Sequence, residues 1–243
     1  MIKDMDNRES SYIVKYTSQL KSADQYTYAH SVNVAFYAML MAKWLGLSKK
    51  EVSFAVQAGL LHDLGKTKIP SSILQKKGPL TAEEFTVMKS HPLQSYKLVY
   101  NCSNMDTEIK EAALLHHERL DGSGYPLGIT SMSILARIVA IADVYDAMTS
   151  DRVYKKGATP FKVFEYFNNE GANLFDLHVL NVFITNISAL LVGSTVRLTN
   201  GDIAKIVFIP QDRPSNPVLR LNDEFVTLPL ASSEIEIEQV IIA

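Results

Sequence analysis

Histidine and aspartate residues recur along this chain at positions that could bind metal. The candidates are His62, Asp63, His91, His116, His117 and Asp143, and the glycine-rich run 121–126 follows the histidine pair. Imidazole nitrogens combined with carboxylate oxygens suit Fe, Mn or Zn, whereas an all-oxygen set would suit Mg or Ca. The sequence therefore predicts a metalloenzyme.

His62 and Asp63 are adjacent, so they can converge on one site only at a helix end, because adjacent side chains on a helix diverge by about 100°. Gly65 fits the end of the helix that precedes it. Since a carboxylate can bridge two metal ions, Asp63 is the natural shared ligand, with neutral imidazoles in the outer positions. His178 lacks the helix-end or glycine-turn setting of the other five histidines, and we interpret it as structural.

The elements that must position these residues are helical from about residue 8 to 190. Ser48 with Glu51 matches a capping box, in which a hydroxyl and a carboxylate satisfy backbone N–H groups at a helix start. His91 precedes a proline, which predicts a helix end or kink there. Further signals are a second capping box at 81–84, a stop at Gly46, a helix from about Asp106 into the histidine pair, one at about 134–148, and a start at Thr159-Pro160.

The pattern changes from helical to alternating after about Leu191. Residues 195–199 and 202–209 flank Asn200-Gly201, a pair that favours a type I′ turn between two strands. A second hairpin is predicted from 218–221 and 225–228, and residues 235–238 alternate like a half-buried strand. We expect a small β module at 192–243.

Composition limits what the protein can be. With 243 residues and 47% apolar side chains, the chain can bury one substantial core and a small second module. The 24 basic residues nearly balance the 26 acidic ones, so a general nucleic-acid-binding surface is not expected. The single cysteine, Cys102, indicates a reducing compartment, and the N-terminus has no apolar signal-peptide region. The longest apolar stretch is too short for a membrane span, so we expect a cytoplasmic protein.

Several motifs together resemble the HD-GYP family over about residues 25–190. The motifs are His30, HDLGK at 62–66, HP at 91–92, HHERLDGSGYP at 116–126, ARIVAIAD at 136–143 and DAMTSDRVY at 146–154. The resemblance implies a mainly α fold: an HD-type helical domain with the extension helices of HD-GYP proteins, followed here by the β module. We expect a helical extension at 1–24, the HD-GYP domain at 25–191 and the β module at 192–243.

The resemblance also implies a role for each site residue. One divalent metal ion would bind His30, His62, Asp63 and Asp143, and the other would bind Asp63, His91, His116 and His117. Iron is the expected metal, with manganese as the alternative. Asp63 and Lys66 would be catalytic, with Lys66 on a substrate phosphate oxygen. The further substrate contacts would be Gly124, Tyr125, Arg152 and Lys155, although Lys155 could equally be a solvated charge beside Lys156.

Three neighbouring residues are harder to interpret from sequence. Glu118 could orient a ligand histidine, and Arg137 could pair with Glu118 or with Asp121; ordinary salt bridges are as good an interpretation of both. Some members of the family carry a glutamate that binds a third metal, and here Tyr26 occupies that position. We therefore expect two metal ions rather than three.

The function that the resemblance implies is hydrolysis of cyclic di-GMP to linear pGpG in bacterial signalling, with further cleavage to GMP left open. Two alternatives remain at this point: a phosphohydrolase for another nucleotide or cyclic dinucleotide, and a non-catalytic module that binds cyclic di-GMP or docks a partner. A protein partner at the GYP loop or the β module, and a homodimer, are also left open. No nucleic acid polymer and no membrane span are expected.

Overall fold

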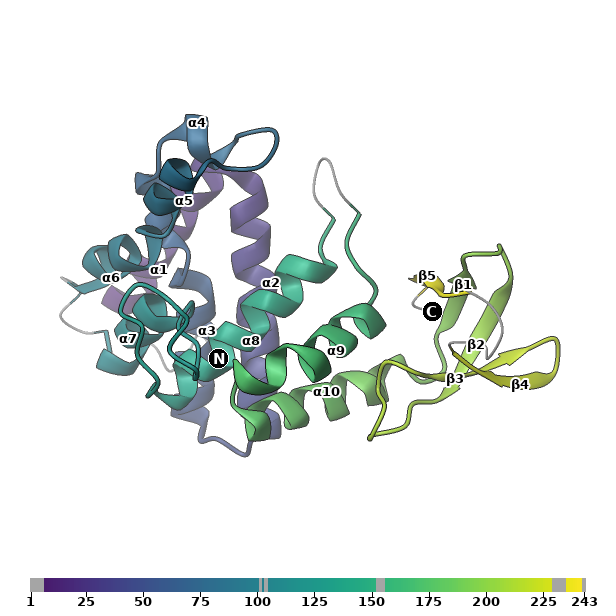
Figure 1. Cartoon of the computed structure of the whole chain (residues 1–243). Helices are drawn as coiled ribbons and strands as arrows, with labels where there is room; N and C mark the ends of the chain where they lie inside the picture. The colour runs from purple at the N-terminus through teal and green to yellow at the C-terminus, as the bar shows by residue number, and fades with distance from the viewer. Residues whose placement is uncertain (1–6, 101, 103–104, 152–155, 229–234, 242–243) are drawn as a thin grey trace. The chain divides into compact units, whose positions relative to one another are not determined.

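The computed structural model describes residues 7–100, 102, 105–151, 156–228 and 235–241, which form two compact units (Figure 1). The first unit contains the described residues up to Ala147 and the segment Asn173–Val179. The second contains Met148–Ala172 and the chain from Leu180 onward. The predicted domain boundaries at residues 25 and 192 stay predictions, although a helix break at Asp24 and a first strand at Thr195 lie close to them.

The first unit is built from helices. They are α1 (Asn7–Ala23), α2 (Gln25–Trp44), α3 (Lys49–Leu61), the 3-10 helix η2 (Leu64–Lys68), α4 (Ser71–Leu74), α5 (Ala82–Met88), α6 (His91–Tyr100), α7 (Thr107–Leu115) and α8 (Ile134–Thr149), whose last residues belong to the second unit. This confirms the mainly α prediction for this part of the chain.

Helix starts and stops follow the local sequence signals. Both predicted capping boxes form, at Ser48 with Glu51 and at Thr81 with Glu84. The carboxylate of Asp106 caps α7. Helix α2 ends before Gly46, whose φ of +72° is a left-handed conformation that glycine adopts without strain. The starts of α3, α5 and α7 and the end of α2 are therefore encoded locally.

Helices α2 and α3 pack unusually closely at Gly59. A Cβ at that position would lie 2.5 Å from the Cα of Ala35 on α2, so a side chain cannot be accommodated there. Small buried residues continue the contact, with Ala38 and Ala58 fully buried. Close packing of α2 on α3 brings the middle of α2 beside the end of α3.

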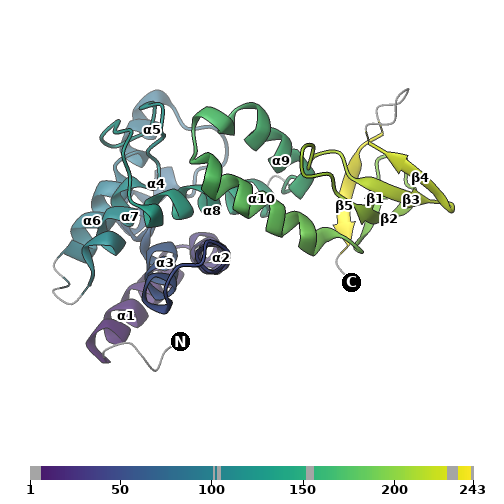
Figure 2. The same cartoon turned by 90° about the horizontal axis from the view of Figure 1, so that it is seen from below.

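The second unit contains the helices α9 (Pro160–Asn169) and α10 (Leu177–Leu191), the latter from Leu180 onward, and an antiparallel sheet. The short η3 (Gly171–Asn173) precedes α10. The strands are β1 (Thr195–Leu198), β2 (Ile203–Phe208), β3 (Val218–Leu221), β4 (Glu224–Thr227) and β5 (Ile237–Ile241), in the order β4-β3-β2-β1-β5 (Figure 2). The predicted β module is confirmed, and one face of its sheet is buried through Val196, Leu198, Ala204, Ile206 and Leu219.

The first predicted hairpin uses a different turn from the one expected, and the second hairpin has the type I′ turn. At Asn200-Gly201 only the glycine has a positive φ, +91°, and Gly201 N–H donates to Leu198 O, so the expected type I′ turn is wrong. This is a three-residue loop with a left-handed glycine. The β3–β4 hairpin instead has positive φ at both Asn222 (48°) and Asp223 (65°), as a type I′ turn requires. Asn and Asp tolerate that conformation better than other non-glycine residues.

Within the described part of the chain, no helix is both long enough and apolar enough to cross a membrane. Cys102 is buried, and its thiol lies 3.9 Å from the Tyr16 hydroxyl. His178 is exposed and capped by Asp176, outside the histidine cluster described below, as its structural interpretation predicted.

Candidate metal centre

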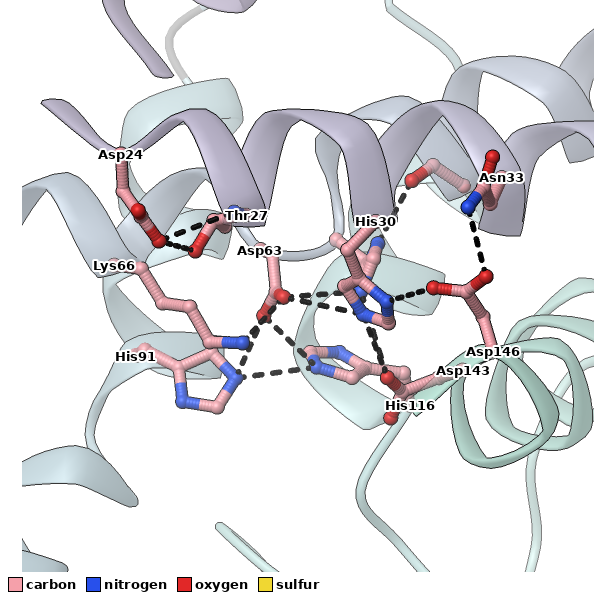
Figure 3. A network of polar contacts seen from close by, with 12 residues as sticks. Asp24, Thr27, His30, Asn33, Asp63, Lys66, His91, His116, Asp143 and Asp146 are labelled. Carbon is pink, nitrogen blue, oxygen red and sulfur yellow. Dashed lines mark hydrogen bonds and ion pairs between the residues drawn. The ribbon is translucent and has the colours of Figure 1, made fainter. Parts of the chain in front are cut away.

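The seven predicted ligands lie together in the first unit. Figure 3 labels five of them: His30, Asp63, His91, His116 and Asp143. Five of the seven stand at helix ends: His62 caps the C-terminus of α3, Asp63 precedes η2, His91 begins α6, and His116 caps α7 with His117 next. The remaining two, His30 on α2 and Asp143 on α8, come from helix interiors. Helix ends thus allow neighbouring residues in sequence to reach one centre.

Three histidines share one orienting contact. The Nδ1 atoms of His62, His91 and His116 lie 2.7, 2.8 and 3.0 Å from the carbonyl oxygens of the residues three positions earlier, Gly59, Met88 and Ala113. A carbonyl can only accept, so each Nδ1 must carry the proton. The Nε2 lone pair of each ring is therefore left for a cation.

Asp63 lies between two sets of these rings. Its Oδ2 is 3.3 Å from His62 Nε2 and 3.6 Å from His30 Nε2, while its Oδ1 is 3.2 Å from His91 Nε2 and 3.9 Å from His116 Nε2. Two clusters of potential ligand atoms result, each within 4.8 Å: His30 with His62 and Asp63, and His91 with His116 and His117. The geometry matches a carboxylate shared between two ions.

Asp143 contacts members of both clusters. Its Oδ1 lies 3.0 Å from His30 Nε2 and 3.9 Å from His62 Nε2, which agrees with the predicted grouping. Its Oδ2 lies 3.8 Å from Nδ1 of His117, which the sequence assigned to the other ion. Asp143 therefore contributes negative charge to both positions.

The donor set fits divalent cations. Two buried atoms, His62 Nε2 and Asp63 Oδ1, have no hydrogen-bond partner among the described residues, and such atoms are rare unless something else satisfies them. In addition, the Nε2 atoms of His91 and His116 face each other at 3.3 Å although both rings carry their proton on Nδ1. Two lone pairs directed at one point need a cation between them or an extra proton.

Electrostatics favour ionised carboxylates and, in the second cluster, neutral imidazoles. Burial raises the pKa of Asp63, but Lys66 and His62 outweigh it and hold the pKa well below its usual range. For Asp143, burial is likewise outweighed, chiefly by the hydrogen bond from His30, so that its pKa is lowered. Burial lowers the pKa of His117 to about 3 and that of His116 well below its usual value. These rings are ready to bind metal at neutral pH.

His30 differs from the other rings. Burial alone would lower its pKa, yet hydrogen bonds with Asp143 and Asp146 raise the pKa to about 9. Asp146, which the sequence interpretation did not assign to the site, holds His30 Nδ1 at 2.7 Å, and Asn33 donates to the other oxygen of Asp146 at 2.9 Å. The spacing of Asp146 three residues after Asp143 could have suggested it, because such residues share a helix face.

Lys66 points at the shared carboxylate. Its Nζ lies 2.5 Å from Asp63 Oδ2. Burial lowers the pKa of Lys66, but the negative charges of Asp63 and Asp143 outweigh burial, so the pKa is raised overall. Gly65 beside it is required for a reason other than the predicted one: a Cβ there would lie 2.0 Å from His91 O, so η2 could not contact α6. The helix α3 has already ended at Leu61, and Gly65 has no left-handed φ.

The loop at 122–130 covers one side of the centre. The Tyr125 ring stacks on His117 with ring centres 4.6 Å apart, and Tyr125 N–H donates to His117 O. Gly124 is again a close approach, since a Cβ would lie 2.4 Å from the Cα of Glu118. Gly122 has a φ of +79°, as the predicted tight loop requires.

Glu118 anchors a loop, and Arg137 forms an ordinary salt bridge, which was one of the two interpretations offered by the sequence. The Glu118 carboxylate is fully buried and accepts hydrogen bonds from the backbone N–H groups of residues 127, 128 and 129, so it anchors the loop and does not orient a histidine. Arg137 pairs with Asp176 at 2.7 Å instead of with Glu118 or Asp121. Arg152 and Lys155 lie outside the described residues.

Tyr26 stands beside His30, where the sequence suggested the loss of a third-metal ligand. The two rings are parallel, with an interplanar angle of 3° and centres 6.4 Å apart. A phenol is a poor replacement for a carboxylate ligand, which is why we expect two ions. The number of ions stays a prediction.

Comparison with known proteins gives a consistent pattern. Residues 10–179 match the HD domain family. The chain is 39% identical over 191 residues to a cyclic di-GMP phosphodiesterase of Pseudomonas aeruginosa, covering 78% of this chain and 46% of that protein. It is 40% identical over 176 residues to a cyclic di-GMP phosphodiesterase response regulator of Xanthomonas campestris, covering 71% and 47%. The chain thus spans about half the length of the curated relatives it matches.

Solved structures agree on the fold. An HDG"Y"P protein from Bdellovibrio bacteriovorus superimposes with a TM-score of 0.55 at 21% identity, over 65% of this chain and 51% of that one. At this identity the likeness supports the helical architecture alone.

Proposed function

Because this chain belongs to the HD domain family, we propose that it is a metal-dependent phosphodiesterase that hydrolyses cyclic di-GMP to linear pGpG. The observation that carries the proposal is Asp63, whose two oxygens face two separate histidine clusters. Relatives that carry the name of this activity supply the substrate class.

Two divalent ions, iron or else manganese, would be held as the sequence predicted: one by His30, His62, Asp63 and Asp143, the other by Asp63, His91, His116 and His117. Bound there, they would supply Lewis acidity and an activated water. The chain's own part is to keep the Nε2 lone pairs directed inward through the Nδ1 contacts of His62, His91 and His116. Burial of these rings excludes bulk water from the donor atoms.

Substrate would approach from the side where the centre is partly open. The side chains of Lys66 and His117 are 22% and 18% exposed, whereas those of Asp63 and His116 are almost completely buried. Lys66 at this rim would meet a phosphate oxygen and offset negative charge that develops on it. Tyr125, with its ring against His117, would offer a face on which a guanine base could stack.

Two ions rather than three follow from Tyr26 in this proposal. The proposed cytoplasmic location rests on the single cysteine, Cys102, which favours a reducing compartment. Arg152 and Lys155 as phosphate contacts, and a protein partner at the loop or the β module, remain predictions from the family resemblance.

The deciding experiment is turnover by protein purified without oxygen and loaded with Fe²⁺ or Mn²⁺. Cyclic di-GMP, cyclic GMP-AMP and bis-p-nitrophenyl phosphate are compared, with Asp63→Asn as the matched inactive control. We expect pGpG from cyclic di-GMP at the highest kcat/KM. Faster cleavage of cyclic GMP-AMP would contradict the proposed substrate. Binding of cyclic di-GMP without cleavage by metal-loaded protein would indicate a receptor and not an enzyme. Three tightly bound ions per chain would contradict the two-metal prediction.

A further inference from the structure

His30 is held differently from the carbonyl-bound rings of the metal centre. His62, His91 and His116 each place Nδ1 against a backbone carbonyl of their own helix or turn. His30 places Nδ1 against the carboxylate of Asp146, on a different helix and 116 residues away. A carbonyl three residues earlier comes with the helix itself, whereas this carboxylate must be supplied by a specific side chain.

The contact is part of a four-residue arrangement across α2 and α8. His30 and Asn33 are three residues apart on α2, and Asp143 and Asp146 are three residues apart on α8, so each pair shares one helix face. Asp143 lies 3.0 Å from His30 Nε2, Asp146 lies 2.7 Å from Nδ1, and Asn33 Nδ2 donates to Asp146 at 2.9 Å. Figure 3 shows His30 between the two aspartates.

The donors and acceptors in this arrangement determine the tautomer. Asn33 donates its amide N–H to Oδ1 of Asp146, which leaves Oδ2 for His30. Carboxylates face both ring nitrogens, Asp146 at Nδ1 and Asp143 at Nε2, so each nitrogen can hold a proton while no metal is bound. When a metal takes the Nε2 lone pair, the one remaining proton sits on Nδ1 and donates to Asp146. Asp146 is 1% exposed, so water cannot easily substitute for it.

We propose that Asp146 is a positioning residue that controls metal binding at one of the two positions, the one formed by His30, His62 and Asp63, and that Asn33 holds Asp146 for this task. The inference rests on the proposed two-metal centre but not on its substrate. In the other cluster, His91 and His116 place Nδ1 against backbone carbonyls, and His117 Nδ1 lies 3.8 Å from Asp143, beyond hydrogen-bond distance. The two positions share Asp63 and Asp143, whereas the Nδ1 contact with Asp146 belongs to His30.

Asp146→Asn is the sharpest test because it keeps the size of the side chain. An amide has one acceptor for two donors, so satisfying Asn33 would turn the amide N–H toward His30 and force the proton onto Nε2, where it blocks the metal. Changes of this kind next to a metal ligand cost about 10–100-fold in metal affinity. We expect the affinity for one Mn²⁺ per chain to fall by that factor, while the affinity for the second Mn²⁺ is unchanged. Asn33→Ala, at an exposed position, should give a smaller loss at the same ion.

Metal retention against a graded chelator at pH 8 measures both ions without reference to turnover. Asp106→Asn is the control, since it makes the same chemical change at a helix cap, where Asn caps as well as Asp. In Zn²⁺-loaded protein, ¹⁵N NMR of the histidine rings should show His30 protonated on Nδ1 in the wild type.

The outcomes separate clearly. Retention of both ions by Asp146→Asn at wild-type strength, or equal loss of both, overturns the proposal, and so does a wild-type His30 ring protonated on Nε2. If Asp146→Asn does not fold, Asn33→Ala decides by the same criterion. Selective loss of one ion in a protein that cleaves no cyclic di-GMP would leave this inference standing and remove the proposed function.

Discussion

Metal binding at the His30 position should strengthen steeply with pH. The pKa of His30 is raised to about 9 because hydrogen bonds with Asp143 and Asp146 outweigh the opposing effect of burial. A metal ion can bind Nε2 only after its proton has left. Below about pH 9 the proton therefore competes with the metal, and above it the competition disappears.

The magnitude follows from that pKa. At pH 7 only about 1 in 100 of the His30 rings would be neutral, a penalty of two pH units at about 1.4 kcal/mol each. The apparent affinity should rise about tenfold per pH unit between pH 6 and 8. His116 and His117 should add no such pH dependence to the second position, because their lowered pKa values leave both rings neutral throughout the range.

The assay is an anaerobic Mn²⁺ titration against a competing chelator at pH 6, 7, 8 and 9, corrected for protonation of the chelator. Two binding phases are expected, and the phase assigned to His30 should rise more steeply with pH; His30→Gln should remove that steep phase. Equal affinities at pH 6 and pH 8 in both phases would refute the assigned charge state of His30. A plateau already at pH 7 would show that the two aspartates do not hold its proton.

Three further predictions concern single residues. Asp63→Asn should lose activity together with both ions, whereas Lys66→Ala should lose activity and keep the ions. Metal analysis and turnover measured on the same protein distinguish the two variants. An Asp63 variant that kept both ions would contradict the ligand assignment. Gly65→Ala should destabilise the protein by about 1–3 kcal/mol or more through overpacking against His91, measured as a lower denaturant midpoint, and an unchanged midpoint would show that the contact is soft. Burial raises the pKa of Asp176, but hydrogen bonds from the backbone of α10 and from the Arg137 guanidinium lower the pKa overall. The ionised carboxylate therefore stabilises the fold above about pH 4, and this stabilisation is lost as the pH falls. Asp176→Asn should make the free energy of unfolding less sensitive to acid, and an unchanged acid dependence would contradict the prediction.

Local sequence signals were sufficient for most element boundaries. Ser48 with Glu51 and Thr81 with Glu84 cap helices as predicted, and Gly46 ends α2, because capping depends on residues within one turn of each other. Five of the ligand residues could be found for the same reason, because their types and their positions at helix ends are visible in the sequence. His30, which lies inside α2, and the grouping of the ligands about Asp63 came from the family resemblance, and the grouping stays a prediction.

What the sequence could not supply depends on partners far away in the chain. Gly65 is glycine because of the backbone of α6, and Glu118 is buried because a loop nine to eleven residues later turns its N–H groups toward it. The spacing of Asp143 and Asp146 was visible, but the imidazole between them comes from α2. The choice between Asn200-Gly201 and Asn222-Asp223 for a type I′ turn was decided by loop length, which a dipeptide signal does not contain.

Gly59 links the packing of two helices to the orientation of a ligand. Its missing side chain lets α3 touch the backbone of α2 at Ala35, and its carbonyl oxygen accepts the Nδ1 proton of His62. An engineer who enlarged this position to improve the core would move the His62 and His30 rings apart in the same step. Core optimisation and ion retention therefore cannot be pursued independently in this protein, and chelator resistance would serve as an inexpensive screen for variants whose helices have shifted.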